Sequence, residues 1–319
     1  MTQNPYASRP WLKHYDPWVP AETTLPGRSL YHLLTLAASQ YRHRTATAFQ
    51  GAELTFGELK EQAERLASAL HAMGISKGDR VGIMMPNSPQ YMIAFFALMR
   101  LGAICANFNP AYTAREVEHQ ANDAGIRAMI TLDTIAPTIL GLQAKTRIET
   151  VIVTSLAEYS EGAVDLKAME GTVSYTGLIR GVETVSLPRV ECDAANDIAV
   201  LQYTGGTTGV SKGAMLTHQS IYANVIQVSH WGGYFTRKGE ERMIVVIPYF
   251  HIYALSVCML LSCWNGTMQI LVPKFDINVL IANFRKYKPS YFPGVPTLYI
   301  SLLNHEEART CGIEEVKVF

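Results

Sequence analysis

A short segment at residues 203–213 combines side chains that can hold phosphate groups. Its sequence is YTGGTTGVSKG, and it lies between an apolar strand pattern and a helix pattern that begins near Thr217. Glycines let the backbone approach a ligand and turn N–H groups toward it, and threonine hydroxyls can donate to phosphate oxygens or reach a magnesium ion. Lys212 adds a positive charge. Because a strand, a glycine-rich turn and a helix typically hold phosphate, the segment predicts a polyphosphate loop, with a flexible surface loop as the alternative.

The elements around this loop alternate between two periodicities. Apolar strand patterns occur at TATAFQ, DRVGIMM, RAMITLD, ETVIVT and DIAVLQY, with helical patterns between most of them. Thr55 with Glu58, and Thr113 with Glu116, have the spacing of capping boxes, so each pair predicts the start of a helix. Apolar strands that alternate with helices favour parallel pairing. The sequence therefore predicts an α/β fold with mostly parallel sheets and helices on both faces.

The polar segment at residues 155–193 interrupts this alternation. It contains glycines and ends in SLPRVECD, which is typical of a surface excursion or linker. We expect two interlocked α/β subdomains, one over residues 1–190 and one over residues 191–319. The second would carry the phosphate loop.

A long uncharged stretch at residues 243–273 raises the question of a membrane span. It contains no Asp, Glu, Lys or Arg, but several polar residues, a proline and a glycine interrupt it. It divides better into a strand (MIVVIP), a turn, a buried helix (ALSVCMLLSCW) and another strand (TMQILVP). A small membrane protein built around this stretch is the disfavoured alternative.

Charge and cysteine content exclude several classes of protein. The 319 residues carry 27 basic and 27 acidic side chains, so no positive excess exists to neutralise a nucleic-acid backbone. The five cysteines are scattered, which indicates buried free thiols in a reducing compartment. The polar N-terminus has no apolar core of a secretory signal. We expect a cytoplasmic protein, with peripheral contact at the inner membrane surface as an option.

The phosphate segment carries a family resemblance. Its spacing is not that of Walker A, because Lys212 is followed by Gly213. The wider segment YTGGTTGVSKGAMLTH instead resembles the phosphate-binding motif of the adenylate-forming (AMP-binding) superfamily of acyl-CoA synthetases, adenylation domains and luciferases. Further segments that resemble motifs of this superfamily are LTFGEL, DRVGIMMPNSPQY, PYFHIYAL and PGVPTLY. The opening WLKHYDPWVP is most similar to bacterial long-chain-fatty-acid–CoA ligases.

The resemblance implies a two-step reaction and a set of site residues. A fatty carboxylate attacks the α-phosphate of ATP to give an acyl-adenylate and pyrophosphate, and coenzyme A then displaces AMP. Thr204 would contact Mg²⁺, and His251 would lie at the carboxylate end of the acyl site, a buried core histidine being the alternative. The β- and γ-phosphates would be held by Gly205, Gly206, Thr207, Thr208, Gly209 and Lys212.

The residues around His251 also predict the substrate class. Relatives that activate amino acids place an aspartate there to hold the α-ammonium group. Residues 250–255 (FHIYAL) offer no carboxylate, and a buried ammonium without a counter-charge would be costly. The substrate is therefore expected to be an apolar carboxylic acid.

The chain also departs from the family pattern. Family members continue past PTLY with an adenine loop, a magnesium-binding glutamate, a ribose-binding aspartate and a small C-terminal domain with a catalytic lysine. None of these motifs occurs in the 319 residues. We expect an N-terminal part of a ligase that does not catalyse adenylation alone. The apolar residues of the final VKVF would lack a neighbouring strand, which favours poor solubility or oligomers. A non-catalytic nucleotide- or acyl-binding remnant, or one half of a split enzyme, is the alternative.

Overall fold

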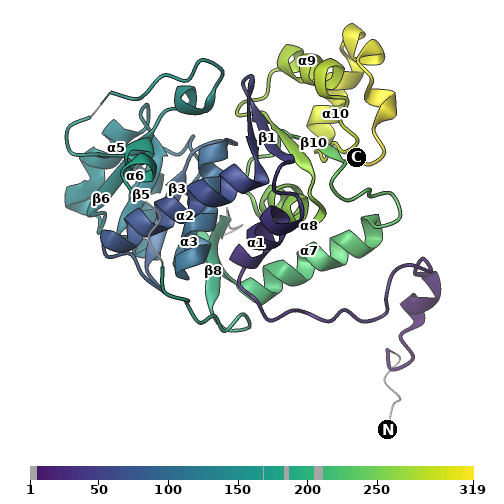
Figure 1. The fold of residues 1–319 in the computed structure, drawn as a ribbon, viewed down its shortest axis with the longest axis horizontal. Helices are drawn as coiled ribbons and strands as arrows, with labels where there is room; N and C mark the ends of the chain where they lie inside the picture. The colour runs from purple at the N-terminus through teal and green to yellow at the C-terminus, as the bar shows by residue number, and fades with distance from the viewer. Residues whose placement is uncertain (1–5, 168, 183–186, 205–210) are drawn as a thin grey trace.

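The computed structural model of the chain describes residues 6–167, 169–182, 187–204 and 211–319. Within these ranges the strands form two sheets, one of seven strands and one of four (Figure 1). The larger sheet has the order β7-β6-β5-β3-β4-β8-β9, and the smaller has the order β10-β11-β1-β2. Their strands are β1 (Thr45–Phe49), β2 (Ala52–Thr55), β3 (Arg80–Met84), β4 (Ile104–Asn107), β5 (Ala128–Leu132), β6 (Thr150–Thr154), β7 (Val173–Ser174), β8 (Ile198–Thr204), β9 (Lys212–Thr217), β10 (Arg242–Val245) and β11 (Met268–Leu271).

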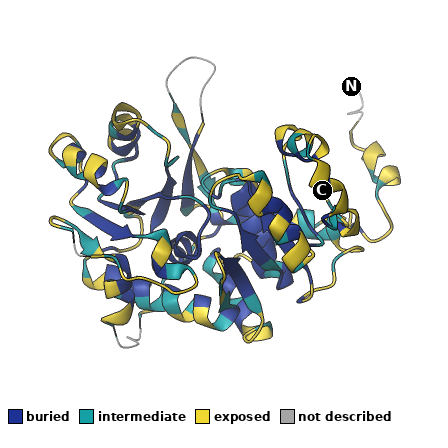
Figure 2. Cartoon of the chain, turned by 90° about the horizontal axis from the view of Figure 1, so that it is seen from above, coloured by how far each residue is buried: buried dark blue, intermediate teal, exposed yellow. Residues whose placement is uncertain are grey.

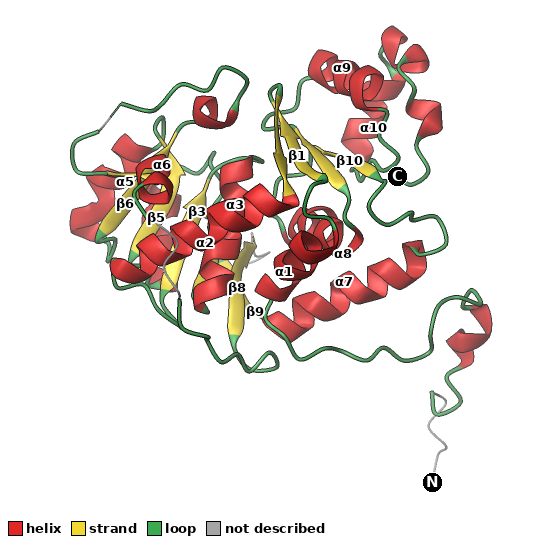
Figure 3. Ribbon diagram, in the orientation of Figure 1, coloured by secondary structure: helices red, strands yellow, loops and turns green. Residues whose placement is uncertain are grey.

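Helices cover the sheets, as Figure 3 shows. The α-helices are α1 (Tyr31–Gln40), α2 (Phe56–Ala72), α3 (Pro89–Leu101), α4 (Ala114–Ala124), α5 (Ala136–Leu142), α6 (Tyr175–Arg180), α7 (His218–Gly232), α8 (Leu261–Asn265), α9 (Ile277–Tyr287) and α10 (Pro296–Leu303). A π-helix, η4 (Ala254–Leu260), runs directly into α8. The short 3₁₀ turns are η1 (Pro10–His14), η2 (Gln143–Lys145), η3 (Leu156–Tyr159), η5 (Glu306–Thr310) and η6 (Ile313–Glu315). The predicted α/β class is confirmed.

The larger sheet is parallel except for β9, and helices bury both of its faces. Alternate residues of one strand pack into different apolar clusters. Val81 and Ile83 join the cluster that contains α2 and α3, whereas Met84 joins the cluster that contains α4 and α5. This division explains why the strand patterns are continuously apolar, as expected for a parallel sheet covered on both sides.

Helix starts follow the local sequence signals. Thr55 and Thr113 each accept a hydrogen bond from the backbone N–H three residues on, and the glutamate at that position bonds back, so both capping boxes form as predicted. In α3 every residue except Arg100 is buried. A helix that is apolar on nearly all sides is expected to be buried on all sides, as α3 is. Figure 2 shows the buried interior of the molecule in dark blue.

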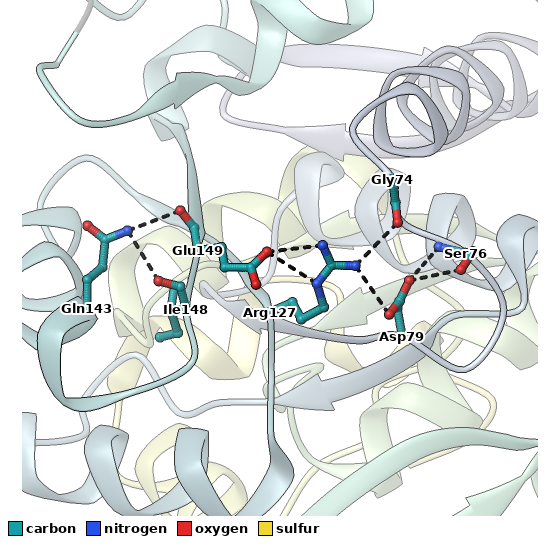
Figure 4. Close-up of polar contacts among 7 residues, drawn as sticks. All are labelled: Gly74, Ser76, Asp79, Arg127, Gln143, Ile148 and Glu149. Carbon is teal, nitrogen blue, oxygen red and sulfur yellow. Dashed lines mark hydrogen bonds and ion pairs between the residues drawn. The ribbon is translucent and has the colours of Figure 1, made fainter.

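An arginine ties together the amino ends of three neighbouring strands (Figure 4). Arg127, just before β5, donates to Glu149, just before β6, at 3.0 Å and to Asp79, just before β3, at 3.4 Å. Asp79 also accepts from the backbone N–H of Ser76 at 2.8 Å. These contacts stabilise the side of the sheet at which the three strands begin. The side at which the strands end takes no part in them.

The smaller sheet joins segments from distant parts of the chain. Thr47 of β1 pairs in parallel with Gln269 of β11, and β1 pairs with β2 in the antiparallel sense. In the larger sheet, β8 pairs in parallel with β4. Each sheet therefore contains strands from both sides of residue 190. The subdomain boundary expected near residue 190 does not coincide with the division between the sheets.

The polar segment at residues 155–193 contains more regular structure than predicted. β7 pairs in parallel with β6, and α6 follows it at once, capped by Ser174. The ring of Tyr175 is fully buried, and its hydroxyl donates to the carbonyl of Gln90 at 2.9 Å. The prediction of a surface excursion is therefore wrong for residues 173–180. A two-residue strand and a six-residue helix are too short to show a periodicity in the sequence.

The uncharged stretch at residues 243–273 forms β10, a turn, η4 with α8, and β11, so the predicted strand–helix–strand division is confirmed. Seven of its residues form a π-helix, which the sequence pattern did not predict. Among the described residues, no helix combines the length and the apolar character that a membrane crossing requires. All five cysteines are free, and four of them are buried, as expected.

The end of the chain pairs on one side. Tyr291 forms isolated parallel bridges with Met243 and Val318, and Phe292 donates its N–H to the carbonyl of Val318 at 2.9 Å. The final residue, Phe319, is more than half exposed beside an apolar groove of about 510 Å³. The expectation that VKVF would face no neighbouring strand is thus wrong on the side of Tyr291.

Candidate functional site

The predicted phosphate loop joins two antiparallel strands. Thr204, at the end of β8, is the register partner of Lys212, at the start of β9, and Ser211 Oγ donates to the carbonyl of Thr204 at 2.9 Å. The helix predicted near Thr217 forms, but Thr217 caps it at the far end of β9. The expected strand–turn–helix context is therefore wrong, and α7 does not point its amino end at the loop. The sequence KGAMLT forms an edge strand in which no residue is buried, and it shows no continuous apolar run that would have predicted a strand.

The described ends of the loop carry two of the predicted site residues. Thr204 and Lys212 are both exposed, on adjacent strands. The other predicted phosphate ligands, Gly205, Gly206, Thr207, Thr208 and Gly209, lie outside the described residues. The structure thus places one hydroxyl and one cation at the mouth of the loop, where both can reach a ligand from solvent.

Gly213 is required by packing next to the loop. A Cβ atom on Gly213 would lie 2.9 Å from the ring of Tyr203, its partner across β8 and β9. That ring is fixed, because the hydroxyl of Tyr203 donates to Asp123 Oδ2 at 2.5 Å. Burial, together with this carboxylate, raises the pKa of Tyr203 above its ordinary value, so the hydroxyl keeps its proton. Gly213 therefore lets β9 lie flat against Tyr203.

Replacing Gly213 with alanine is expected to lower the free energy of unfolding by about 1–3 kcal/mol, because the new methyl group must displace a tethered ring. Chemical denaturation of both proteins measures this change. Gly141→Ala is the matched control, since nothing lies within 4 Å of a Cβ on Gly141 of α5. In a helix interior that substitution should be stabilising by about 0.5–1 kcal/mol. Equal effects at the two glycines would contradict the packing role of Gly213.

His251 lies in the turn between β10 and the π-helix. Its backbone N–H donates to the carbonyl of Pro248 at 3.0 Å, and its carbonyl accepts from Leu255 at 3.0 Å. The side chain is exposed, and among the described residues none forms a hydrogen bond with its imidazole. Although the side chain is reached by solvent, desolvation by its neighbours lowers the pKa of His251 below its ordinary value, which favours the neutral ring. These features fit a ring that meets a ligand better than a core histidine, and π-helical turns are frequent at functional sites.

Two buried amides bring the loop and the His251 turn together. Gln202, two residues before Thr204, donates Nε2–H to the carbonyl of Phe250 at 2.9 Å. Asn87 follows β3 and donates to the carbonyls of Val245, Ile247 and Val272, while its Oδ1 accepts from the N–H of Tyr249 at 2.8 Å. The segments around Thr204 and His251 are therefore neighbours in space, at the carboxyl edge of the larger sheet, where ligands bind in open α/β folds.

Residues 34–317 match the sequence pattern of a family described as AMP-binding enzyme. The chain belongs to the AMP-binding enzyme family. It is 35% identical over 325 residues to a long-chain-fatty-acid–CoA ligase of Bacillus subtilis (strain 168), and the match covers 98% of this chain and 58% of that protein. It is 36% identical over 316 residues to the long-chain-fatty-acid–CoA ligase of Salmonella typhimurium (strain LT2), covering 93% of this chain and 56% of the relative. The chain thus spans somewhat more than half the length of these relatives.

Solved structures of AMP-binding enzymes show the same fold. A long-chain-fatty-acid–CoA ligase from Archaeoglobus fulgidus matches with a TM-score of 0.77 and 25% identity, covering 88% of this chain and 55% of that one. The N-terminal domain of FACL13 from Mycobacterium tuberculosis matches with a TM-score of 0.76 and 24% identity, covering 91% and 68%. The fold of this chain is therefore that of the N-terminal part of acyl-CoA ligases.

The donor set at the site fits one particular mode of magnesium binding. Among the described residues, no group of three His, Cys, Asp or Glu side chains could hold a metal ion. Mg²⁺ in nucleotide-binding enzymes keeps several waters and is held by one or two protein side chains, usually carboxylates, together with oxygens of the phosphates. A single hydroxyl such as that of Thr204 is consistent with this mode, in which the nucleotide brings the ion.

The two amides that join the site could not be recognised as functional residues from the sequence. Asn87 and Gln202 are nearly fully buried, at 2% and 5% exposure. Each lies at the end of an apolar strand pattern, where a polar residue at a buried position is the available signal. The partners through which they join the two segments lie at least 48 residues away along the chain, so these contacts could not be predicted.

Proposed function

We propose that this chain is the ATP- and acyl-binding part of an AMP-forming fatty-acid–CoA ligase. Membership of the AMP-binding family and the two ligase relatives support the reaction class. The observation that carries the proposal is the hydrogen bond between Gln202 and Phe250, because it places the mouth of the phosphate loop beside the His251 turn. A nucleotide at one and a carboxylate at the other could then react with each other.

The proposed reaction has two steps. A carboxylate oxygen of the fatty acid attacks the α-phosphorus of ATP, and the bond to the β-phosphate oxygen breaks to release pyrophosphate. The thiol of coenzyme A then attacks the acyl carbon, forms the thioester and releases AMP. Lys212 pairs with phosphate oxygens of ATP, and Thr204 donates to a phosphate or contacts the Mg²⁺ that neutralises them. The neutral His251 orients the carboxylate by a hydrogen bond without adding a charge.

The environment of His251 supports an apolar acid as the substrate. The next residues are Ile252, Tyr253, Ala254 and Leu255, and the last two are fully buried. No acidic residue occurs between residues 248 and 260, so this stretch offers an ammonium group no counter-charge. A fatty acid, which carries only a carboxylate and an alkyl chain, satisfies these surroundings.

We expect palmitate to displace a fluorescent fatty-acid probe from the purified chain and phenylalanine not to displace it. His251→Asp should weaken the binding of palmitate about tenfold or more, because a carboxylate would face the carboxylate of the ligand. His43→Asp, at another exposed histidine, is the control and should bind palmitate as the unaltered chain does. Equal displacement by palmitate and phenylalanine would refute the proposed substrate class.

A second candidate is a nucleotide- and acyl-binding protein that does not catalyse the reaction alone, either as a remnant or as one half of a split enzyme. The chain covers 58% and 56% of the two relatives, so catalysis by this chain alone is tested separately from binding. Exchange of labelled pyrophosphate into ATP in the presence of palmitate separates the two candidates. Exchange by this chain would support the ligase reaction directly and would exclude the second candidate. Binding without exchange would mean that this chain does not catalyse the first step by itself, as the second candidate requires and as the sequence led us to expect.

The remaining proposals concern surroundings and partners. We place the protein in the cytoplasm, with peripheral contact at the inner membrane surface and with self-association. Five free thiols support a reducing compartment. Exposed apolar side chains such as Met215 and Leu303 supply surface for contact with lipid or with a second copy.

A further inference from the structure

We infer that Gln202, Asn107 and Tyr91 are positioning residues that hold the His251 turn in register with the stem of the phosphate loop. The inference rests on the proposed function and adds to it a specific set of residues with no contact to substrate. They form one buried chain of hydrogen bonds between β8, β4, α3 and the turn at residues 249–251.

The chain of hydrogen bonds has a fixed direction. Gln202 faces two backbone carbonyls, those of Phe250 at 2.9 Å and Tyr203 at 3.4 Å, so its NH₂ group must point toward them. Its Oε1 therefore turns to Asn107, whose Nδ2 donates to it at 3.2 Å. The Oδ1 of Asn107 is then left to accept from the hydroxyl of Tyr91 at 2.6 Å. Reversing either amide would set a carbonyl oxygen against another carbonyl oxygen.

Two backbone carbonyls of the His251 turn contact this series of hydrogen-bonded side chains. Gln202 holds the carbonyl of Phe250, the residue before His251. The hydroxyl of Tyr91 also lies 3.2 Å from the carbonyl of Tyr249. The peptide unit before His251 is therefore bonded to Gln202, on the strand that ends at Thr204. The preceding peptide unit lies against the hydroxyl of Tyr91 on α3, whose proton goes mainly to the nearer Asn107.

Burial makes this arrangement rigid. Tyr91 is fully buried, and Asn107 and Gln202 are 3% and 5% exposed. Water cannot replace a lost partner at such depth, so each amide has one low-energy orientation. A polar chain in the core is costly unless every member is paired, and a hydrophobic residue would fill the same space. The reaction needs its two reacting groups to be placed accurately, since a misplacement of about 1 Å can cost about 100-fold in rate. This need explains why polar rather than hydrophobic residues lie between the two segments of the site.

The test compares matched pairs of buried residues. Gln202→Met removes the three polar contacts of the side chain while keeping its length. Gln90→Met removes the polar contacts of another buried glutamine, whose amide bonds Thr154 and Ser155 instead. Tyr91→Phe removes the hydroxyl that bonds Asn107. Tyr249→Phe removes a hydroxyl that bonds Gln269, in a ring whose centroid lies 5.3 Å from that of Tyr91.

The readout is the imidazole of His251, which does not require activity. The full chain is labelled with ¹³C at the histidine rings, and the signal of His251 among the nine histidines is assigned by its loss in His251→Gln. In the absence of ligand, we expect that signal to shift or broaden in Gln202→Met and in Tyr91→Phe, and to stay in place in Gln90→Met and Tyr249→Phe. A His251 signal that is unmoved in Tyr91→Phe and, if it folds, in Gln202→Met overturns the inference.

Adding ATP with Mg²⁺ separates this inference from the proposed function. If the unaltered chain binds ATP, the His251 signal should move, and Gln202→Met should lose that movement while its affinity for ATP changes by less than threefold. If the unaltered chain does not bind ATP, the proposed function fails, but the ligand-free comparison still decides the inference. Should Gln202→Met fail to fold, Tyr91→Phe alone decides it, because that substitution removes one oxygen atom and keeps the ring.

Discussion

Replacing Asn87 with alanine should lower the free energy of unfolding by about 3–5 kcal/mol, which is among the largest effects of a single substitution. The side chain of Asn87 bonds three carbonyls and one N–H at the carboxyl ends of β10 and β11 and in the segment that follows β10. Alanine would remove this partner from each group. A buried group left unsatisfied costs about 1–3 kcal/mol, and the cost is smaller for the carbonyl of Val245, which still accepts from the N–H of Val272 at 3.0 Å. Urea denaturation followed by tryptophan fluorescence measures the change.

The control for this substitution is Asn122→Ala on α4. Its side chain also donates to a carbonyl, that of Lys145 at 3.0 Å, but the contact is exposed. Water can replace it, so the expected loss is below about 1 kcal/mol. If Asn87→Ala also lowered the free energy of unfolding by less than about 1 kcal/mol, the smaller sheet would not depend on the hydrogen bonds of Asn87.

Replacing Lys212 with alanine should weaken the binding of ATP–Mg²⁺ about 10- to 150-fold. A charge-assisted hydrogen bond to phosphate is worth about 1.5–3 kcal/mol, and 1.4 kcal/mol corresponds to a factor of ten. Lys212 is exposed at the mouth of the loop, and no described carboxylate forms a salt bridge with it, so its charge is available to a ligand. Titration calorimetry of the full chain with ATP–Mg²⁺ gives the affinity.

Lys274→Ala is the matched control, because Lys274 is also exposed but lies in the loop after β11. That variant should bind ATP–Mg²⁺ with unchanged affinity. If Lys212→Ala binds equally well, the cation that holds the phosphates lies elsewhere and the assignment of Lys212 is wrong.

Most of the fold could be predicted because its signals are local. Capping boxes at Thr55 and Thr113, and apolar runs for β3, β5, β6 and β8, depend on residues within a few positions of each other. Elements without such a signal were missed. β9 is an edge strand that is held extended by its pairing with β8, and the two residues of β7 are held extended by their pairing with β6.

The site was predicted only as separate motifs. Thr204, Lys212 and His251 stand in segments with recognisable sequences, but the hydrogen bonds that bring these segments together run between side chains and distant backbone. Asn87 forms hydrogen bonds with residues about 160 positions further along the chain. The apolar pattern around Asn87 and that of the segment it contacts would be the same without these bonds. Amides such as Gln202 are also common at exposed positions, so their type alone does not reveal that they are buried.

The order of strands in the smaller sheet has a consequence for synthesis on the ribosome. β1 is made early, yet its parallel neighbour β11 lies roughly 220 residues later, since Thr47 pairs with Gln269. At a synthesis rate of about 5–20 residues per second, β11 is made on the order of 10–40 s after β1. During that time the strand TATAF has an unpaired, apolar edge. The nascent chain is therefore expected to depend on chaperones that cover this strand until residue 271 has left the exit tunnel.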